Sequence, residues 1–178
     1  MLNDIKVIKS HESTNLEEIE KFEHLIQAKL PSDYKQFLLK HNGGHPVFDA
    51  FELSEPINKK NTGILVEWFY ALHDKEVSNI VLEFQRSRGK IPDEFLPIAC
   101  DDGGDLCLGI RGDDYGSLYY WTTNWSFWSE DDLNYLYFVS NSFTDFINGL
   151  YELNVKDNNI IRRYQDGTVT IEPLQKPK

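Results

Sequence analysis

Three short apolar runs between residues 95 and 122 constrain the fold of this chain more than any other feature. The runs cover 95–100, 106–111 and 118–122, and the segments DDGGD (101–105) and GDDYGS (112–117) separate them. Gly, Asp and Ser favour tight turns, and short apolar runs joined by such turns pair as neighbouring strands. The block therefore predicts an antiparallel three-stranded meander whose two links lie at opposite ends of the sheet.

Helical patterns flank this block on both sides. The predicted helices cover residues 14–30, 31–41, 78–88, and 140 or 142 to 150. Either Thr14 with Glu17 or Asn15 with Glu18 offers the first helix a capping box, and Ser78 is the expected cap of the third. The other predicted strands cover residues 47–53, 64–72, 135–139, 160–164 and 168–171, the last two as a weak hairpin. This mixture predicts an α+β fold in a single domain, with a mainly antiparallel sheet and helices packed against it.

The negative charge of the chain is concentrated in its middle segment. The 178 residues contain 18 Lys and Arg and 29 Asp and Glu, a formal net charge of −11. Residues 93–160 alone have a net charge of −11, and 10 of the 24 aromatic residues lie between 115 and 138. Most of these aromatic residues are expected in the core, but Tyr and Trp beside acids also suit a recognition surface for a basic partner.

The same composition argues against two kinds of partner. A nucleic-acid binder needs a basic face, and a membrane-surface helix is usually basic as well, so neither partner is expected. No uncharged apolar run approaches the ~20 residues that a transmembrane helix needs. The N-terminal residues MLNDIKVIKS contain no apolar signal core, so a cytoplasmic location is expected.

Three ordered motifs in this chain resemble the SUKH superfamily of Smi/Knr-like proteins. They are L-P-x-x-Y-x-x-F followed by N-G-G, F-L-P-I-A followed by D-x-G-G-D, and a Y-x-W strand end. The matching positions are Leu30, Pro31, Tyr34, Phe37, Asn42, Gly43, Gly44, Pro97, Gly104 and Trp121. The resemblance covers a domain at 15–150, between an N-terminal extension (1–14) and a C-terminal extension (151–178), for which a hairpin packed on the same domain is expected. The chain departs from many relatives in having Thr122-Thr123-Asn124 where they carry a His.

The resemblance implies a non-catalytic protein-binding module. Bacterial members are read as immunity proteins that bind and neutralise polymorphic toxins, many of them nucleases, and fungal members act as binding hubs in cell-wall glucan synthesis. An immunity protein with a basic toxin domain as its partner is the first hypothesis, and a regulatory scaffold is the alternative. A third hypothesis, a carbohydrate-active protein, rests on acids beside Trp and Tyr, but nothing singles out one carboxylate pair.

The expected partner-binding surface combines two acidic loops at one end of the sheet. The link 101–105 and the loop 129–132 should lie at that end, whereas the link 112–117 should be peripheral. The candidate residues are Asp101, Asp102, Asp105, Trp125, Trp128, Glu130, Asp131 and Asp132. The family-motif positions have a structural interpretation instead, since glycines and prolines at these places bound helices and turns.

No cofactor, metal or catalytic motif is predicted. The 101–105 link lacks the order of a calcium-binding loop, and Gly43-Gly44 should break any helix that would align His41 with His45. Cys100 and Cys107 would point to opposite sheet faces across a five-residue link, or lie diagonally on one face across a four-residue link. Neither arrangement bridges easily, so both cysteines are expected to be reduced.

Overall fold

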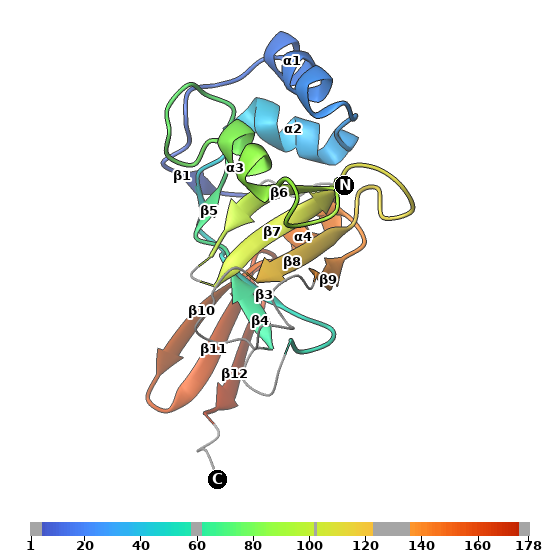
Figure 1. Ribbon diagram of the computed structural model, residues 1–178. Helices are drawn as coiled ribbons and strands as arrows, with labels where there is room; N and C mark the ends of the chain where they lie inside the picture. Colours follow the sequence, from blue (N-terminus) through green and yellow to red (C-terminus); the bar gives the residue numbers. More distant parts are fainter. Residues whose placement is uncertain (1–4, 58–61, 102, 123–135, 175–178) are drawn as a thin grey trace.

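The computed structural model describes residues 5–57, 62–101, 103–122 and 136–174. Within these residues it contains four helices and twelve strands in three sheets (Figure 1). The helices are α1 (Leu16–Ile26), α2 (Ser32–His41), α3 (Ile80–Ser87) and α4 (Phe143–Gly149). All recorded strand pairs within the sheets are antiparallel, so the predicted α+β class is confirmed.

The predicted meander forms the centre of the main sheet. The strands of this sheet, in spatial order, are β5 (Trp68–Phe69), β6 (Phe95–Cys100), β7 (Gly104–Gly109), β8 (Leu118–Thr122) and β9 (Leu136–Ser140). Strand β7 pairs with both β6 and β8, and a bulge between Pro97 and Ala99 interrupts the pairing with β6. Because successive hairpins turn at alternate ends, the two links lie at opposite ends of this sheet, as expected.

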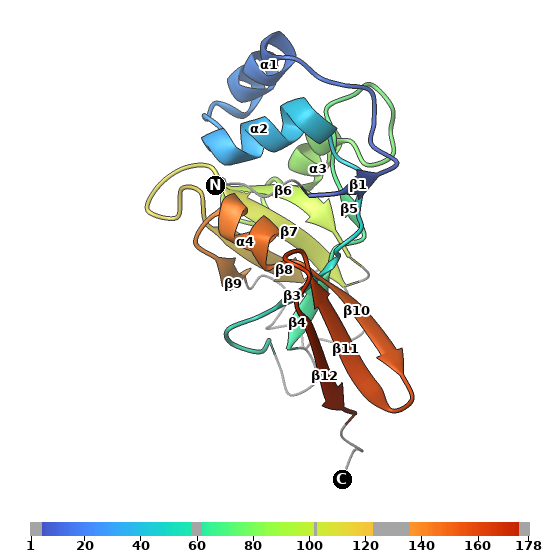
Figure 2. The same cartoon turned by 180° about the vertical axis from the view of Figure 1, so that it is seen from behind.

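The core lies mainly between the helices and one face of the main sheet. Leu106 and Leu108 of β7 belong to a large buried cluster with Tyr34 and Phe37 of α2 and Phe143 of α4. The intervening Cys107 points to the other face, where a smaller cluster contains Trp121. In Figures 1 and 2, α1 and α2 lie beyond one end of the sheet and α4 lies against one of its faces. No helix in the described ranges is long and apolar enough to cross a membrane.

Capping explains where the helices begin. Asn15 and Glu18 form the capping box of α1, so the second of the two predicted pairs is the one used. The Ser78 prediction was wrong: Asn79 caps α3 by accepting from Val81 and Leu82 N–H, while Ser78 has φ 56°. The side chain of Ser142 caps α4 by accepting from Asp145 N–H at 3.0 Å.

The second sheet corrects the prediction of one strand over residues 64–72. Its order is β12 (Val169–Pro173), β11 (Asn159–Tyr164), β10 (Tyr151–Lys156), β3 (Ala50–Glu52) and β4 (Gly63–Leu65). The run 64–72 is not one strand, because β4 pairs with β3 whereas β5 pairs with β6 of the main sheet. The two-stranded third sheet pairs β1 (Val7–Ile8) with β2 (His45–Pro46).

The C-terminal extension contains three strands, where sequence patterns predicted two. The hairpin of β11 and β12 is present, and β10 precedes it through a two-residue turn at Asp157 and Asn158, both with positive φ. Strand β10 pairs with β3 only at Tyr151 and Ala50, and the three strands then project away from the main sheet (Figures 1 and 2). We call β10, β11 and β12 the C-terminal sheet arm.

Candidate protein-binding surface

The acidic turn between β6 and β7 uses one of its carboxylates to hold its own shape. Cys100 pairs with Asp105, so four residues link the strands, the shorter of the two alternatives. Asp101 Oδ1 accepts from the backbone N–H of Gly103 at 2.7 Å and of Gly104 at 2.8 Å, and from Tyr120 Oη at 2.6 Å. This carboxylate therefore has a structural role whether or not a partner also contacts it.

Asp105 lies largely inside the protein. The hydroxyl of Tyr70 donates a hydrogen bond to Asp105 Oδ1. The pKa of this carboxyl is raised to about 6, mainly by burial and in smaller part by the negative charges of Glu83 and Asp101, although the hydrogen bond from Tyr70 opposes the shift. Burial also raises the pKa of the neighbouring Cys100 thiol to about 11. Asp105 is thus a poor candidate for the first electrostatic contact with a partner.

The other predicted members of the surface lie outside the described residues. These are Asp102, Trp125, Trp128, Glu130, Asp131 and Asp132. Strand β8 ends at Thr122, which pairs with Gly104, and β9 begins at Leu136, which pairs with Trp121. The chain therefore leaves and re-enters the main sheet beside the acidic turn, and the assignment of 129–132 to this end stays a prediction.

The link 112–117 at the opposite end holds itself together through internal contacts. Tyr119 Oη donates to Asp114 Oδ1 at 2.6 Å, and Ser117 N–H donates to Asp114 C=O at 2.9 Å. Asp113 and Tyr115 remain exposed. Tyr115 faces a hollow that sequence patterns did not predict.

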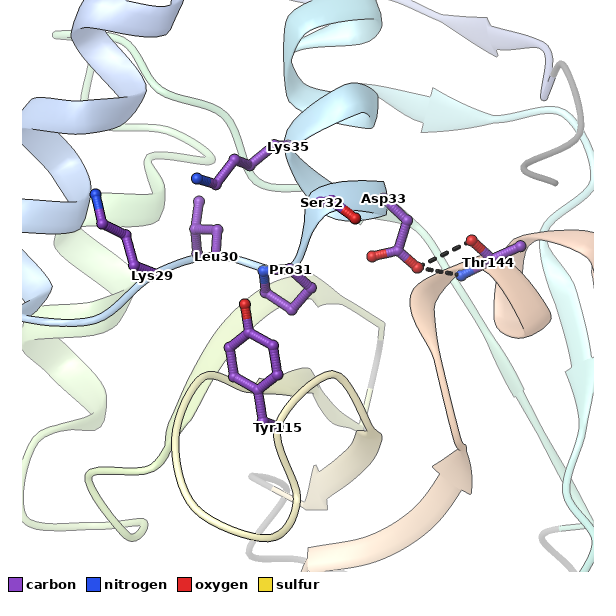
Figure 3. Close-up of a pocket in the computed structure, with 8 residues that line it drawn as sticks. All are labelled: Lys29, Leu30, Pro31, Ser32, Asp33, Lys35, Tyr115 and Thr144. Atoms are coloured by element: carbon purple, nitrogen blue, oxygen red, sulfur yellow. Dashed lines mark hydrogen bonds between the residues drawn. The ribbon is translucent and has the colours of Figure 1, made fainter.

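This hollow lies beside the family-motif residues Leu30 and Pro31 and has a volume of about 570 Å³. It is lined by Lys29, Leu30, Pro31, Ser32, Asp33, Lys35, Tyr115 and Thr144 (Figure 3). Asp33 Oδ2 accepts from both N–H and Oγ1 of Thr144 at 2.9 Å, which fixes the start of α2 to the start of α4. The lining residues come from three distant stretches of sequence, so only the tertiary structure could reveal the hollow.

A buried carboxylate fixes the two lysines at the rim of this hollow. Glu23 has a 1% exposed side chain, and its oxygens lie 2.7 Å from Lys29 Nζ and 2.5 Å from Lys35 Nζ. Leu30 N–H donates to Glu23 Oε1 at 2.8 Å. Burial alone would raise the pKa of Glu23, but these three bonds outweigh it and the pKa is lowered. Since Glu23 and Asp33 balance the two lysines, the hollow is not a strongly cationic site.

The N-G-G motif joins three segments of the fold. Asn42 caps the C-terminus of α2 with φ 47° and is 1% exposed. Its Nδ2 donates to the carbonyls of Glu12 at 2.6 Å and Leu72 at 2.8 Å, and its Oδ1 accepts from Leu72 N–H at 2.9 Å. Gly43 has φ 78°, and a Cβ there would lie 2.6 Å from Phe69 O. These contacts support the structural interpretation of this motif.

The remaining motif positions are also parts of the folded core. Leu30, Tyr34 and Phe37 are buried in the large cluster and Trp121 in the small one. A Cβ on Gly104 would lie 2.1 Å from Trp121 O, so only glycine permits β7 and β8 to approach so closely there. Strand β5 pairs with β6 at Ala99 and Cys100 only. Pro97 therefore lies on a part of β6 that does not pair with β5.

The described part of the chain offers neither a cluster of metal ligands nor a reactive thiol. No group of three or more His, Cys, Asp or Glu residues is close enough there to hold a metal ion. His41 ends α2, whereas His45 begins β2 with its Nδ1 2.6 Å from Glu67 O. Cys100 and Cys107 are both free in this structure, and burial also raises the pKa of Cys107.

Comparisons with known proteins agree with the motifs. The sequence model of the SMI1 / KNR4 family (SUKH-1) matches residues 13–149. The SPbeta prophage-derived uncharacterized protein YokK of Bacillus subtilis (strain 168) is 25% identical over 170 residues, which cover 88% of this chain and 82% of that protein. Since the family model matches well over half of the chain, this protein belongs to the SMI1 / KNR4 family (SUKH-1).

Proposed function

We propose that this chain is a non-catalytic immunity protein that binds a basic toxin domain in the cytoplasm and neutralises it. Family membership supports a role in protein–protein interaction. The observation that carries the finer proposal is the charge distribution. Residues 93–160 have a net charge of −11, and within this segment β8 ends beside the acidic turn between β6 and β7. The prophage origin in the name of the relative is consistent with a gene carried for competition between cells.

An acidic surface suits this role for a physical reason. A toxin that cleaves nucleic acid needs a cationic site for phosphate groups, and an acidic protein competes for that site. Opposite charges also raise the association rate, often by one to three orders of magnitude at low salt (about 10–10³-fold). A fast association rate lets an immunity protein capture the toxin before the toxin damages the cell.

The described acids and thiols argue for binding rather than catalysis. The carboxylates of Asp101 and Asp105 accept hydrogen bonds from Tyr120 and Tyr70, respectively. Both thiols have raised pKa values, so little thiolate would form near neutral pH. These groups serve the fold, which leaves the exposed acids for contact with a partner.

Coexpression tests the proposal directly. The proposal predicts a toxin gene immediately upstream of this gene. Its toxin domain should arrest growth when expressed alone, and coexpression of this chain should restore growth. Purified chain and toxin domain should form a complex whose association rate falls as salt rises, because salt screens exposed charges. Growth arrest that persists at equal expression, together with no complex at micromolar concentrations, would refute the proposal.

Charge reversal locates the surface. Asp102→Lys combined with Asp131→Lys should slow association with the toxin domain, most clearly at low salt. The matched control, Asp113→Lys with Asp114→Lys, changes the net charge equally at the opposite end of the main sheet and should slow it much less. Loss of binding in the control alone would mean that the interface lies at the end with the link 112–117 and not at the proposed end. Unchanged affinity in both variants would make the acidic segment a solubility feature only.

A further inference from the structure

The C-terminal sheet arm begins after the last residue of the family match, which ends at 149. The arm projects from the rest of the protein, and β12 ends at its far end (Figure 1). Apolar side chains are exposed on both of its faces. They include Val155 at 57%, Val169 at 51% and Ile171 at 63% exposure. Exposed apolar residues on both faces of a set of strands are typical of an element that binds a partner.

The outer edge of the arm is strand β12, which pairs only with β11 among the described strands. Flanking hydrogen bonds show which backbone groups face outward: Tyr164 N–H donates to Thr168 C=O at 2.9 Å, and Leu174 N–H donates to Asn158 C=O at 2.7 Å. Since bonding alternates along an antiparallel strand, the even-numbered residues of β12 face β11. The N–H and C=O groups of Val169 and Ile171 therefore point away from the sheet.

Proline restricts how this edge can be used. Pro173 occupies the next outward position and has no N–H to donate. Val169 and Ile171 are then the two residues of β12 with complete outward pairs of donor and acceptor. An edge that is open over only this short length favours one specific register over extended aggregation.

We propose that two copies of this chain pair through β12 in antiparallel fashion, centred on Ile171. This register joins the two arms into one continuous sheet. Ile171 lies opposite Ile171 of the second copy and exchanges two hydrogen bonds with it, and Val169 lies opposite Pro173. All three side chains share one face by the alternation of strand side chains, so an apolar row crosses the junction. Thr170 faces Glu172 on the other side, and no like charges are opposed.

The charge distribution also favours a second copy at this place. Residues 1–150 contain 13 Lys and Arg against 25 Asp and Glu, whereas 151–174 contain 3 against 4 and are nearly neutral. In the antiparallel pair the two acidic bodies lie at opposite ends of the joined arms. A strand of six residues is roughly 20 Å long, about twice the Debye length of ~8–10 Å at physiological salt. Repulsion between the bodies is therefore largely screened.

The other open edge of the arm is less accessible to a second copy. Beyond Tyr151, no described strand pairs with the other edge of β10. Tyr151 at the start of β10 pairs with Ala50 of β3, and the pKa of the preceding Asp49 is raised by burial and, to a smaller extent, by the nearby charge of Glu152. A second arm laid along β10 would meet this part of the protein. Strand β12 has no such neighbour among the described strands.

Sedimentation velocity with a matched pair of proline variants tests the proposal. The wild-type mass should rise from 20.8 kDa toward twice that value between about 1 and 200 µM, a range typical of small, weak interfaces. Ile171→Pro removes an outward N–H and leaves the bonds to β11 in place, so it should remain monomeric throughout this range. Val155→Pro makes the equivalent change on the outer edge of β10, and it should dimerise like the wild type.

Hydrogen exchange provides a second readout that needs no substitution. The Ile171 amide should exchange quickly in dilute wild-type protein and at least tenfold more slowly at 200 µM, whereas the Thr170 amide should be protected at both concentrations. A wild-type mass that stays at 20.8 kDa, or loss of dimer in Val155→Pro but not in Ile171→Pro, would overturn the proposal. Protection of Ile171 only when the toxin domain is added would assign this edge to that partner and would likewise overturn it.

Discussion

Replacing Asn42 by alanine should strongly destabilise the protein. The side chain is buried at 1% exposure and makes three hydrogen bonds to the backbone of Glu12 and Leu72. Each such bond contributes about 1 kcal/mol net. The left-handed conformation at φ 47° adds a penalty of about 1 kcal/mol for a residue with an ordinary Cβ. Asn42→Ala should therefore reduce the free energy of unfolding by about 4 kcal/mol, a large part of the ~5–15 kcal/mol of a typical domain.

A glycine variant separates the two contributions. Asn42→Gly removes the same three hydrogen bonds but accepts the left-handed backbone, so it should be about 1 kcal/mol less destabilising than Asn42→Ala. Urea denaturation followed by Trp fluorescence and circular dichroism measures both values, and an unchanged m-value would show that the unfolded state is comparable. Asn154→Ala, an exposed strand position, should change stability by less than ~0.5 kcal/mol.

Two results would refute this reasoning. A loss below about 1 kcal/mol in Asn42→Ala would mean that the three hydrogen bonds contribute little net stability. Equal losses in the glycine and alanine variants would mean that the left-handed backbone carries no penalty. Conversely, a folded Asn42→Gly protein that still binds the toxin domain would show that the motif acts through folding.

Three further predictions concern buried groups and the absence of cross-links. The pKa of Asp105 is raised to about 6 in the folded protein, so the folded state binds a proton at this carboxyl more tightly than the unfolded state does. The contribution of Asp105 to the free energy of unfolding should therefore fall as pH rises from about 4 to 7. Asp105→Asn should flatten this part of a plot of urea midpoint against pH. The pKa of Glu23 is lowered, so the stability that this carboxylate contributes is present above the ordinary pKa of 4.5 and is lost as pH falls. Glu23→Gln should reduce the free energy of unfolding at pH 7 and should lose less stability in acid than the wild type. An unchanged urea midpoint at pH 7 would contradict the three stabilising contacts of this carboxylate. Thermal melts with and without a chelator, and with and without reductant, should superimpose, whereas a drop of many degrees would reveal a metal or a disulfide.

The local parts of the fold could be predicted from sequence because their signals are short in range. Gly and Asp at 101–105 and 112–117, between apolar runs, suffice for hairpins, so the meander of β6, β7 and β8 was predicted correctly. Apolar spacing likewise located the four helices of the described residues. The Ser78 prediction failed because two adjacent residues both had capping side chains, and only the backbone conformation shows that Asn79 is the cap.

The assignment of strands to sheets needed the tertiary structure. The run 64–72 has uniform strand character, yet the backbone passes from one sheet to the other between Leu65 and Trp68. Residues 151–156 alternate between apolar and polar but follow a helix directly, and they were not recognised as β10. Periodicity describes the neighbours of a residue in the chain, whereas pairing depends on partners many residues away.

The chemical state of the predicted site also depended on tertiary contacts. Sequence alone located the excess of acids at 93–160, and this charge is a property of composition that no fold can change. The structure showed that Asp101 accepts three hydrogen bonds and that Asp105 is partly buried and accepts a hydrogen bond from Tyr70. It also revealed the hollow at Pro31, whose lining is contributed by residues of the segment 29–35, by Thr144 of α4 and by Tyr115 of the link 112–117. A carboxylate becomes a surface charge or a buried hydrogen-bond acceptor according to what packs around it, and that packing is set by contacts between residues distant in sequence.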